Sequence, residues 1–479
     1  MVFTSPVFIF FFLPLVLAIY FFAKDKYRNF ILLFFSLMFY AWGEVFYLLV
    51  MILSITINYF VGIYIDKQTE DKKKKTGLTI GITLNLLLLL FYKYINFISD
   101  NINIVLQEIG FQTIDIVPIH LPLGISFFTF HAISYIVDVY KKKATALKNI
   151  LHLGLYISLF PQLIAGPIIR YHNIARQIYT RLHTTKLFVS GIERFTLGLS
   201  KKMLIANPLG EVADKIFALA NNDLTMPLAW IGIIAYSLQI YFDFSGYSDM
   251  AIGLGRMFGF RFLENFNYPY ISKSLREFWR RWHISLSTWF RDYLYFPLGG
   301  SQSSTLITYR NLLIVFLLTG VWHGASWNFI AWGLFHGFFL AIEHAGFSTI
   351  LKKRSAMTQH IYLLLIITIS WVFFRAENLQ ASFTYLNAMI NFQKFYIEPI
   401  YFQSLFSNEF LVISVIAIIL STPIYPILKK KMLHLSDKGD VIYYFTFNIL
   451  KFFVLFILLY LSLLKISAST YNPFIYFRF

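Results

Sequence analysis

The sequence has no cysteine among its 479 residues, and only 14% of them are charged. The absence of cysteine excludes disulfides, thiolate nucleophiles, cysteine-ligated metals and palmitoylation, so any covalent chemistry must use oxygen or nitrogen. In soluble globular chains roughly a quarter of all residues are charged. Because 58% of this chain is hydrophobic, with a mean hydropathy of +0.63, we expect an integral membrane protein.

Acidic residues are scarce as well: 24 Asp and Glu stand against 41 Lys and Arg, for a net charge of +17. In a soluble chain such an excess suggests nucleic-acid binding. Here the basic residues cluster in loops between apolar runs, where they face anionic lipid headgroups, and no basic stripe with stacking aromatics lies outside those runs. We therefore expect the lipid membrane as a partner and no nucleic acid.

Long apolar runs dominate the rest of the chain. A membrane span needs about 20 apolar residues. The first run is preceded by no basic residue and followed by no small-residue cleavage site, so we expect a retained span rather than a signal peptide. The clear candidate spans are 7–23, 46–65, 78–98, 187–205, 228–252, 360–376, 410–428 and 442–464.

Three further apolar runs are short or interrupted. Residues 30–42 are too few for a full span, and 119–140 and 150–169 contain Gly and Pro. Broken helices at membrane depth are tolerated only where they are buried in protein or line a cavity. We expect an all-α polytopic protein, a single domain over residues 1–479, with roughly ten to twelve membrane helices, several of them partial or re-entrant.

Lysine runs predict the orientation of the chain. Lys72–Lys75 mark a cytoplasmic loop, since cytoplasmic loops are enriched in Lys and Arg. Counting spans from this loop places the N-terminus and the segment 377–409 outside, and the basic runs at 352–354 and 429–431 inside. The tail 466–479 then lies on the extracytoplasmic side.

The stretch Ser272–Gly300 differs from the spans. It mixes charged residues and large aromatics at helical spacing, including Trp279, Arg280, Arg281 and His283. This composition is too polar to cross a membrane and too apolar to stand free in water. It predicts a helix that lies in the membrane interface.

One histidine, His323, lies between the apolar stretches 312–318 and 329–340. An ionisable side chain there is costly unless it has a partner or lines a polar cavity, so it marks a functional site by default. Histidine takes and returns a proton near neutrality. Gly320 and Gly324 flank it and permit a close helix approach or a break. No HExxH motif is present, and the spacing to His336 does not favour a shared metal, so we expect no metal site.

A second polar cluster interrupts the apolar run 228–252, and it comprises Asp243, Ser245, Tyr247 and Asp249. These groups imply an internal polar cavity, although hydrogen bonding between helices explains any one of them equally well. The carboxylates are candidates to orient a histidine or to pair with an arginine such as Arg256. Ser245 lacks a GxSxG elbow, so we do not expect a serine nucleophile.

Three strings of this sequence, QIYFDFSGYSDMAIGLGRMFGFRF, FWRRWHISLSTWFRDYLYFPLGG and TGVWHGASWNFIAWGLFHG, resemble the membrane-bound O-acyltransferases. The resemblance is to the bacterial subgroup that O-acetylates exported polysaccharides such as alginate and peptidoglycan, and it runs from about Leu121 through Trp371. It implies a ring of tilted and re-entrant helices around a thin central funnel. It also implies that His323 is catalytic and that His283 is an accessory polar residue near the channel.

The aromatic C-terminus is a further point of resemblance. By composition alone the tail 466–479 would be an interfacial anchor, because exposed aromatics are unfavourable in water. The related bacterial systems share an aromatic C-terminal motif whose tyrosine is proposed to carry the acyl group, and Tyr476 is the matching residue. Tyr476 lies 12 residues beyond Leu464. An extended tail of that length covers ~40 Å, which exceeds half of a ~30 Å hydrocarbon core.

The resemblance implies an acetyltransferase component of a bacterial inner membrane, with acetyl-CoA as the cytoplasmic donor and no bound cofactor. His323 would be the general base, and Tyr476 a possible acyl carrier. Arg280 and Arg281 would attract the phosphates of the donor, although lipid phosphates would serve equally well. A periplasmic SGNH-type partner would deliver acetyl to the glycan, either peptidoglycan, which we favour, or alginate or another exopolymer.

A transporter or flippase without covalent chemistry is the alternative class. It shares the polar midplane residues and the basic inner surface. It would require internal repeats with corresponding broken helices, which the sequence does not show, and it would leave the aromatic tail without a role.

Overall fold

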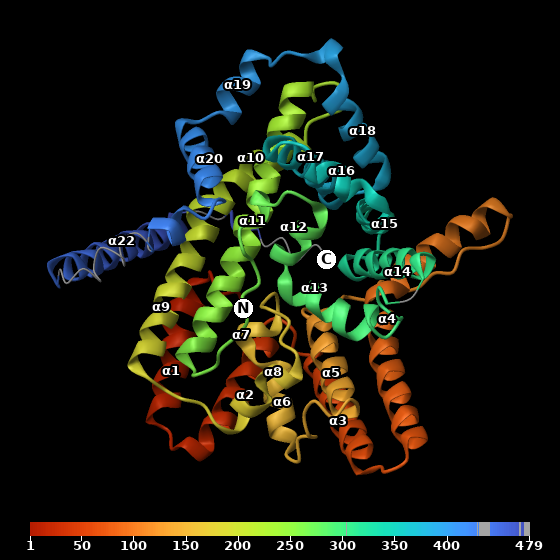
Figure 1. The fold of residues 1–479 in the computed structure, drawn as a ribbon, viewed down its shortest axis with the longest axis vertical. Helices are drawn as coiled ribbons and strands as arrows, with labels where there is room; N and C mark the ends of the chain where they lie inside the picture. The colour runs from red at the N-terminus through yellow and green to blue at the C-terminus, as the bar shows by residue number, and fades with distance from the viewer. Residues whose placement is uncertain (303, 429, 431–440, 469–470, 474–479) are drawn as a thin grey trace. The chain divides into compact units, whose positions relative to one another are not determined.

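The computed structural model describes residues 1–479 except 303, 429, 431–440, 469–470 and 474–479. All regular secondary structure in the described residues is helical, which confirms the all-α polytopic class (Figure 1). The chain falls into two compact units. Unit 1 comprises Met1–Gly191 and Ala251–Leu263, and unit 2 comprises Ile192–Met250 and Glu264–Arg478.

Unit 1 is built from the N-terminal helices. Helices α9 and α11 each contribute residues to both units. The elements are η1 (Phe8–Phe12), α1 (Leu13–Phe22), α2 (Asp25–Ala41), α3 (Leu48–Lys67), α4 (Asp71–Glu108), α5 (Ile125–Tyr140), α6 (Ile150–Ser158), α7 (Phe160–Leu163), α8 (Tyr171–Tyr179) and α9 (Thr185–Ser200).

Unit 2 carries both histidines of the predicted site. Its elements are η2 (Lys201–Ala206), α10 (Asn207–Phe217), α11 (Met226–Met257), η3 (Pro269–Ile271), α12 (Leu275–Arg281), α13 (Ile284–Phe290), η4 (Arg291–Tyr295), α14 (Thr305–His323), α15 (Trp327–Ile342), η5 (Glu343–Phe347), α16 (Ser348–Lys352), α17 (Ala356–Arg375), α18 (Leu379–Ile390), η6 (Phe392–Lys394), α19 (Pro399–Leu405), α20 (Asn408–Leu420) and α22 (Val441–Ala468).

Seven helices of the described chain are long and apolar enough to cross a membrane, or eight if the bent pair α19 and α20 forms one span. Two shorter apolar helices, Phe8–Phe22 and Ile125–Tyr140, add to these. The hairpin Thr305–His323 and Trp327–Lys352 supplies two spans that were not among the clear predicted runs. The predicted run 187–205 is not one of the seven, because charged residues at 193–194 and 201–202 interrupt it.

The interrupted runs of unit 1 are buried in protein, as predicted for broken helices. Every residue from Leu153 to Ile169 is buried. Gly124 precedes α5 with φ of +74°, and a Cβ there would lie 2.8 Å from the carbonyl oxygen of Leu163. Only glycine fits this left-handed position against a neighbouring backbone.

The predicted interfacial helix at 272–300 is wrong as a single element. Helices α12 and α13 are short, and they are separated at His283, which has a φ of +41°. A non-glycine residue in this left-handed region ends one helix before the next begins. Their large side chains are buried rather than spread along an interface: Leu275, Phe278, Trp279, Trp282, Leu286, Trp289 and Phe290.

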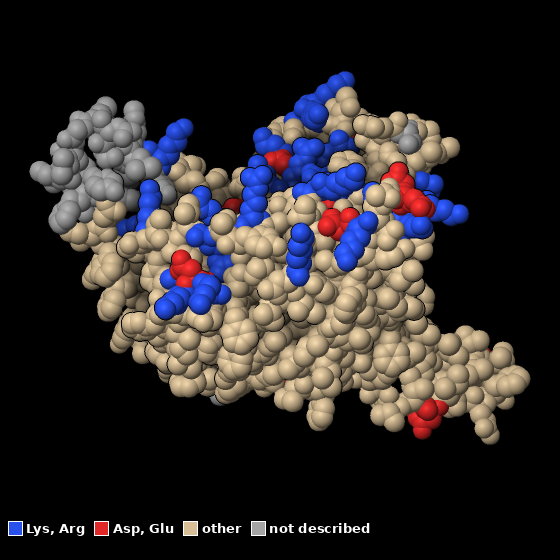
Figure 2. Space-filling view, turned by 90° about the horizontal axis from the view of Figure 1, so that it is seen from below, with Lys and Arg blue, Asp and Glu red and all other residues tan. Residues whose placement is uncertain are grey.

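The surface separates charge from apolar area. On the face shown in Figure 2, Lys and Arg gather in a band, and a wide adjoining area carries almost no charged side chains. Large apolar residues are exposed on the predicted spans, among them Phe60 on α3, Leu87 on α4 and Phe452 on α22. Exposed apolar area of this extent fits a surface that faces lipid.

Candidate active site

His323 is the last residue of α14, and the helical conformation ends directly after it. Gly324 is extended, with φ of −171°, and α15 begins at Trp327. Gly320 faces Gly333 across the hairpin, since a Cβ added at Gly320 would lie 3.1 Å from the Gly333 Cα. The two flanking glycines therefore do both things that the sequence allowed: Gly320 permits close packing of α14 on α15, and Gly324 stands at the break.

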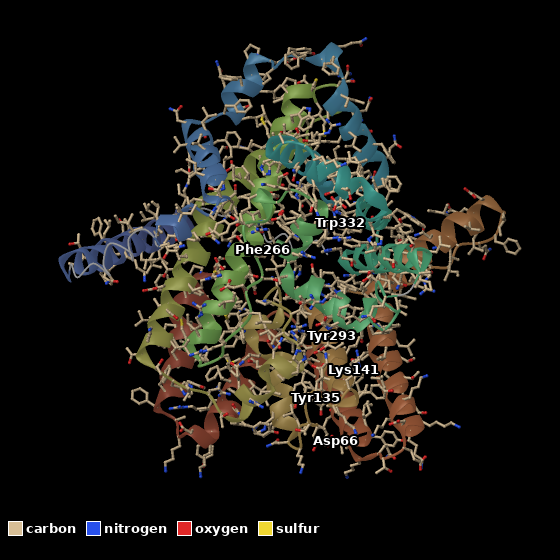
Figure 3. All side chains as sticks on the ribbon, in the orientation of Figure 1. Asp66, Tyr135, Lys141, Phe266, Tyr293 and Trp332 are labelled. Atoms are coloured by element: carbon tan, nitrogen blue, oxygen red, sulfur yellow. The ribbon has the colours of Figure 1, made fainter. Side chains whose placement is uncertain are left out.

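Aromatic rings enclose the His323 imidazole, which is 6% exposed. The ring centroids of Trp322, Trp332 and Phe374 lie 4.8, 4.9 and 5.0 Å from its own. Trp332, labelled in Figure 3, comes from α15 and Phe374 from α17. Such walls exclude water, and electrostatic interactions inside them are stronger than in water.

His283 is held by an asparagine that the sequence analysis did not identify. His283 Nδ1 lies 3.1 Å from Asn265 Oδ1, and both side chains are 1% exposed. Asn265 Oδ1 also accepts from the backbone N–H of Ser285, and Asn265 Nδ2 donates to Ser248 Oγ at 2.9 Å. Since Oδ1 is an acceptor, His283 must carry its proton on Nδ1.

This arrangement leaves a lone pair on the opposite nitrogen. His283 Nε2 is buried and has no hydrogen-bond partner among the described residues. Burial lowers the pKa of His283 to about 3, so the ring is neutral at physiological pH. Its ring lies 4.6 Å from that of Phe244 and 6.4 Å from that of Trp322, the residue next to His323. The rings of His283 and His323 therefore both lie near that of Trp322.

The carboxylates of α11 form ion pairs. Asp243 lies 2.7 Å from Lys202, and both side chains are less than 5% exposed. Asp249 pairs with Arg194 and Lys201, each at 2.7 Å.

Cationic pairing was one of the two alternatives considered for these carboxylates, with Arg256 as the example named. The structure pairs them with Lys202, Lys201 and Arg194. The signal for the actual partners was the pair of lysines at 201–202 inside an apolar run. Removing one partner of a buried ion pair typically costs about 3–5 kcal/mol, so these pairs constrain the positions of α9, η2 and α11.

The remaining predicted residues of α11 are buried between these ion pairs. Ser245 and Tyr247 are 1% and 3% exposed. The hydroxyl of Ser245 has no hydrogen-bond partner among the described residues. Its strand-free, helical surroundings agree with the absence of a nucleophile elbow.

The two predicted donor-binding arginines end α12 and differ in their surroundings. Arg281 is paired with Glu277 at 2.9 Å and donates to the carbonyl of Asn267. Arg280 is exposed. Its guanidinium is therefore available to an anion at the surface, whereas that of Arg281 is occupied within the fold.

Tyr476 lies outside the described residues. The nearest described part of the tail is Tyr471–Pro473, which contacts α10 and η2 of unit 2. Among the described residues, no group of three or more His, Asp or Glu side chains is arranged to hold a metal ion.

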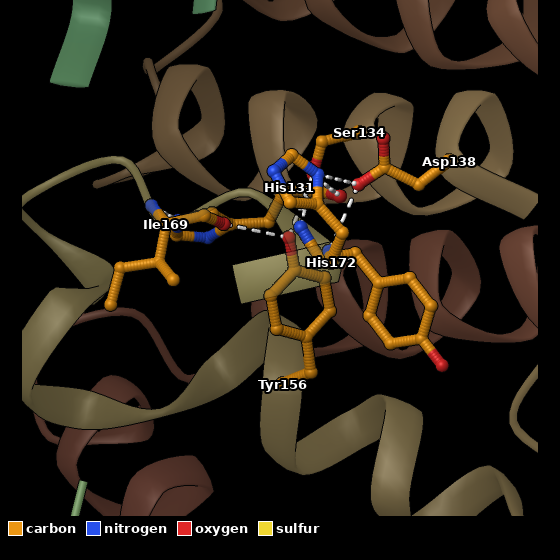
Figure 4. Close-up of polar contacts among 7 residues, drawn as sticks. His131, Ser134, Asp138, Tyr156, Ile169 and His172 are labelled. Carbon is orange, nitrogen blue, oxygen red and sulfur yellow. Dashed lines mark hydrogen bonds and ion pairs between the residues drawn. The ribbon is translucent and has the colours of Figure 1, made fainter. Parts of the chain in front are cut away.

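Unit 1 contains a separate buried polar cluster (Figure 4). Asp138 lies 2.8 Å from His172 Nδ1 and accepts from the His172 backbone N–H. Tyr156 Oη lies 2.7 Å from Ser134 Oγ and donates to the carbonyl of Ile169. These bonds connect α5 and α6 to the backbone at 169–172, so the cluster holds the broken segment in place.

Comparison with known proteins shows the family of the chain. The pattern of the membrane-bound O-acyltransferase family matches residues 37–386, which include His283 and His323. The probable alginate O-acetylase AlgI of Azotobacter vinelandii is 40% identical over 501 aligned positions that cover both chains completely.

Two other relatives are named for acyl transfer to cell-wall polymers. The peptidoglycan O-acetyltransferase of Helicobacter pylori is 38% identical, covering 81% of this chain and 80% of its own. The teichoic acid D-alanyltransferase of Bacillus subtilis is 31% identical over 45% of this chain and 56% of its own. The chain belongs to the membrane-bound O-acyltransferase family, and the prediction of a multi-pass membrane enzyme that performs O-acetyl transfer is confirmed.

Proposed function

We propose that this enzyme moves acetyl groups from acetyl-CoA in the cytoplasm to a polysaccharide outside the membrane. One observation carries the proposal: two buried histidines, His283 and His323, both lie near the ring of Trp322 within unit 2. Family membership supplies the acyl-transfer chemistry, and the two relatives of greatest coverage reported above are named for acetylation of polysaccharides.

His323 is the general base in this proposal. It removes the proton from an attacking hydroxyl, whose oxygen forms an ester bond with the acetyl carbon as the carbon–sulfur bond of acetyl-CoA breaks. The proton then passes from the imidazole to the departing thiolate. Such proton transfer contributes about 10²–10⁴ in rate, and a dry aromatic cage keeps the thioester from hydrolysis.

The acceptor hydroxyl in this scheme is the phenol of Tyr476. A phenol has a pKa of about 10, so it needs a base to react near neutrality. The acetyl-tyrosine ester is then a substrate for an extracytoplasmic partner, an SGNH-type enzyme that transfers acetyl to the glycan. On the donor side, exposed Arg280 offers a cation to the phosphates of acetyl-CoA.

Replacement of His323 tests the proposal directly. We expect His323→Ala to abolish glycan acetylation while the protein accumulates normally in the membrane. Loss of the base removes at least ~10² of the rate, and His152→Ala in unit 1 is a matched control, because His152 lies outside the proposed site. Near-normal acetylation by His323→Ala would overturn the assignment.

The glycan is an exported polysaccharide, and relatives that act on peptidoglycan and on alginate are both present among the matches. We propose peptidoglycan as the acceptor, with alginate or another exopolymer as the second candidate. Mass spectrometry of muropeptides and of secreted polymer, in strains with and without the gene, distinguishes them. If deletion of the gene removes acetyl groups from the secreted polymer alone, the acceptor is the exopolymer and not peptidoglycan.

The proposed location is a bacterial inner membrane with the tail on the extracytoplasmic side. Because the chain has no cysteine, Ser469→Cys introduces a unique label. We expect a membrane-impermeant maleimide to modify it in intact spheroplasts. Labelling only after lysis would place the tail in the cytoplasm and contradict the delivery route.

A further inference from the structure

The described part of the tail is bound through its polar groups. Tyr471 donates its phenolic proton to Asp214 Oδ2, with 2.7 Å between the oxygens. The other oxygen of Asp214 accepts from Arg375 Nη2 at 2.5 Å. Burial and the hydrogen bond to Asp214 raise the pKa of Tyr471, so this phenol stays protonated. Tyr471 is therefore suited to docking and unsuited to accepting an acyl group.

The carbonyls of Tyr471 and Pro473 and the side-chain amide oxygen of Asn472 accept further hydrogen bonds. Asn207 Nδ2 lies 3.3 Å from the carbonyl oxygen of Tyr471 and 3.4 Å from Asn472 Oδ1. The ammonium of Lys202 donates to the carbonyl of Pro473. Interfacial anchoring requires only apolar contact, whereas these bonds select the register of the tail.

The contacts of the tail lie along the consecutive helical elements α10 and η2. Successive tail residues meet Asp214, Asn207 and Lys202, positions that span α10 and η2. Twelve helical residues rise about 18 Å at 1.5 Å per residue. Asp214 is near the end of α10 and pairs with the last residue of α17, while Lys202 is paired with Asp243 in a buried environment. The contacts of the tail thus run from the Asp214–Arg375 pair to the buried Lys202–Asp243 pair.

Space for the phenol comes from a glycine. A Cβ added at Gly210, on α10, would lie 3.1 Å from Tyr471 Oη and closer still to the side chain of Gln239. A larger residue would push against both groups. The absence of a side chain at 210 is part of what admits Tyr471.

Helix α11 connects the ion pair at the described end of the tail with a neighbour of His283. Asp243, the partner of Lys202, is followed by Phe244, whose ring lies 4.6 Å from that of His283. Tyr476 is three residues beyond Pro473, a distance of at most about 11 Å along an extended chain. A tail fixed at Pro473 therefore limits where the Tyr476 phenol can reach.

We propose that Lys202, Asn207, Asp214 and Arg375 form a tail cradle that sets the register of the C-terminal segment and so presents Tyr476 to the active site. These four are positioning residues, and the inference rests on the proposed role of Tyr476 as acetyl carrier. The cradle recognises a segment of this same chain by a phenol, an amide and a backbone carbonyl.

A spacing experiment tests the cradle in the full-length enzyme in membranes. Gly-Ser is inserted either after Pro473, between cradle and Tyr476, or after Ser469, upstream of the cradle. The first insertion moves Tyr476 by up to about 7 Å relative to the cradle, and the second leaves that spacing unchanged. Acetyl-Tyr476 is measured by mass spectrometry of the C-terminal peptide, in cells without the extracytoplasmic partner.

We expect the downstream insertion to lower the rate of Tyr476 acetylation at least tenfold and the upstream insertion to change it less than twofold. Misplacement of a reacting group by 1 Å can cost on the order of 10² in rate. Equal effects of the two insertions, or none, would overturn the cradle. Absence of acetyl-Tyr476 in the unmodified enzyme, with glycan acetylation intact in Tyr476→Phe, would instead overturn the carrier role.

A single hydroxyl provides the second measurement. Tyr471→Phe keeps the ring and removes the donor to Asp214, and we expect a severalfold slower acetylation of Tyr476 with normal protein abundance. Tyr460→Phe is the matched control, since Tyr460 is 56% exposed on α22. A Tyr471→Phe enzyme that acetylates Tyr476 at the rate of the control would contradict the role of Asp214 and Arg375.

Discussion

Two histidines of this protein use Nδ1 in similar ways with different results. In unit 1, Nδ1 of His172 lies 2.8 Å from a carboxylate oxygen of Asp138. In unit 2, Nδ1 of His283 lies 3.1 Å from an amide oxygen of Asn265. The carboxylate of Asp138 accepts hydrogen bonds from both the ring and the backbone of His172, whereas the amide oxygen of Asn265 fixes the tautomer of His283.

The two rings also differ in exposure and in the number of hydrogen bonds around them. The His172 side chain is 23% exposed, and its aspartate also accepts from the backbone, so the pair ties the chain at 172 to α5. His283 is buried, neutral and has an unoccupied Nε2 among the described residues. The comparison teaches that the partner of each histidine distinguishes the pair that ties the chain together from the accessory ring of the proposed site.

Removal of each ring gives the largest expected difference. We expect His283→Ala to lower glycan acetylation by about 10² or more, the usual magnitude for a group that accepts a proton or hydrogen bond in the reaction. His172→Ala should retain most of the activity per molecule of folded enzyme. Initial rates normalised to membrane-protein abundance measure both. An active His283→Ala enzyme would remove the distinction between the two sites.

Replacing Asn265 by aspartate should give His283 the kind of partner that His172 has. Asn265→Asp places a carboxylate beside His283 and raises the pKa of the imidazole from its value of about 3. The protonated ring has no lone pair on Nε2, so activity should fall as the pH drops below the raised pKa and recover above it. Rates of the variant and the native enzyme, compared from about pH 5.5 to about pH 8.5, provide the measurement. Parallel pH profiles would contradict this function of Asn265.

The reciprocal exchange should affect stability and leave catalysis intact. Asp138→Asn weakens the charged hydrogen bonds to His172, which are worth about 1.5–3 kcal/mol when an ion takes part. We expect a lower thermal midpoint in detergent and unchanged acetylation per folded molecule. A variant with the native midpoint and lost acetylation would place the unit 1 cluster in the reaction.

Much of this protein could be predicted from its sequence. Apolar length and scarce charge determine a polytopic helical class, because backbone groups in lipid must be satisfied within a helix. An ionisable residue in such surroundings is costly, so the chain alone predicts His323 as a functional residue, and this stays a prediction. Glycines at 320 and 324 indicated both a close approach and a break, and the structure contains both.

Only the tertiary structure decided which groups became partners. Asp243 and Asp249 were recognised as buried charges, but Lys202, Lys201 and Arg194 are brought to them by the packing of α9 and η2 on α11. The tautomer of His283 depends on Asn265, 18 positions earlier, and the docking of Tyr471 on Asp214, 257 positions earlier. The sequence shows which polar groups are costly to bury. Which partners offset that cost depends on the distances and directions between packed helices, and no local sequence pattern contains them.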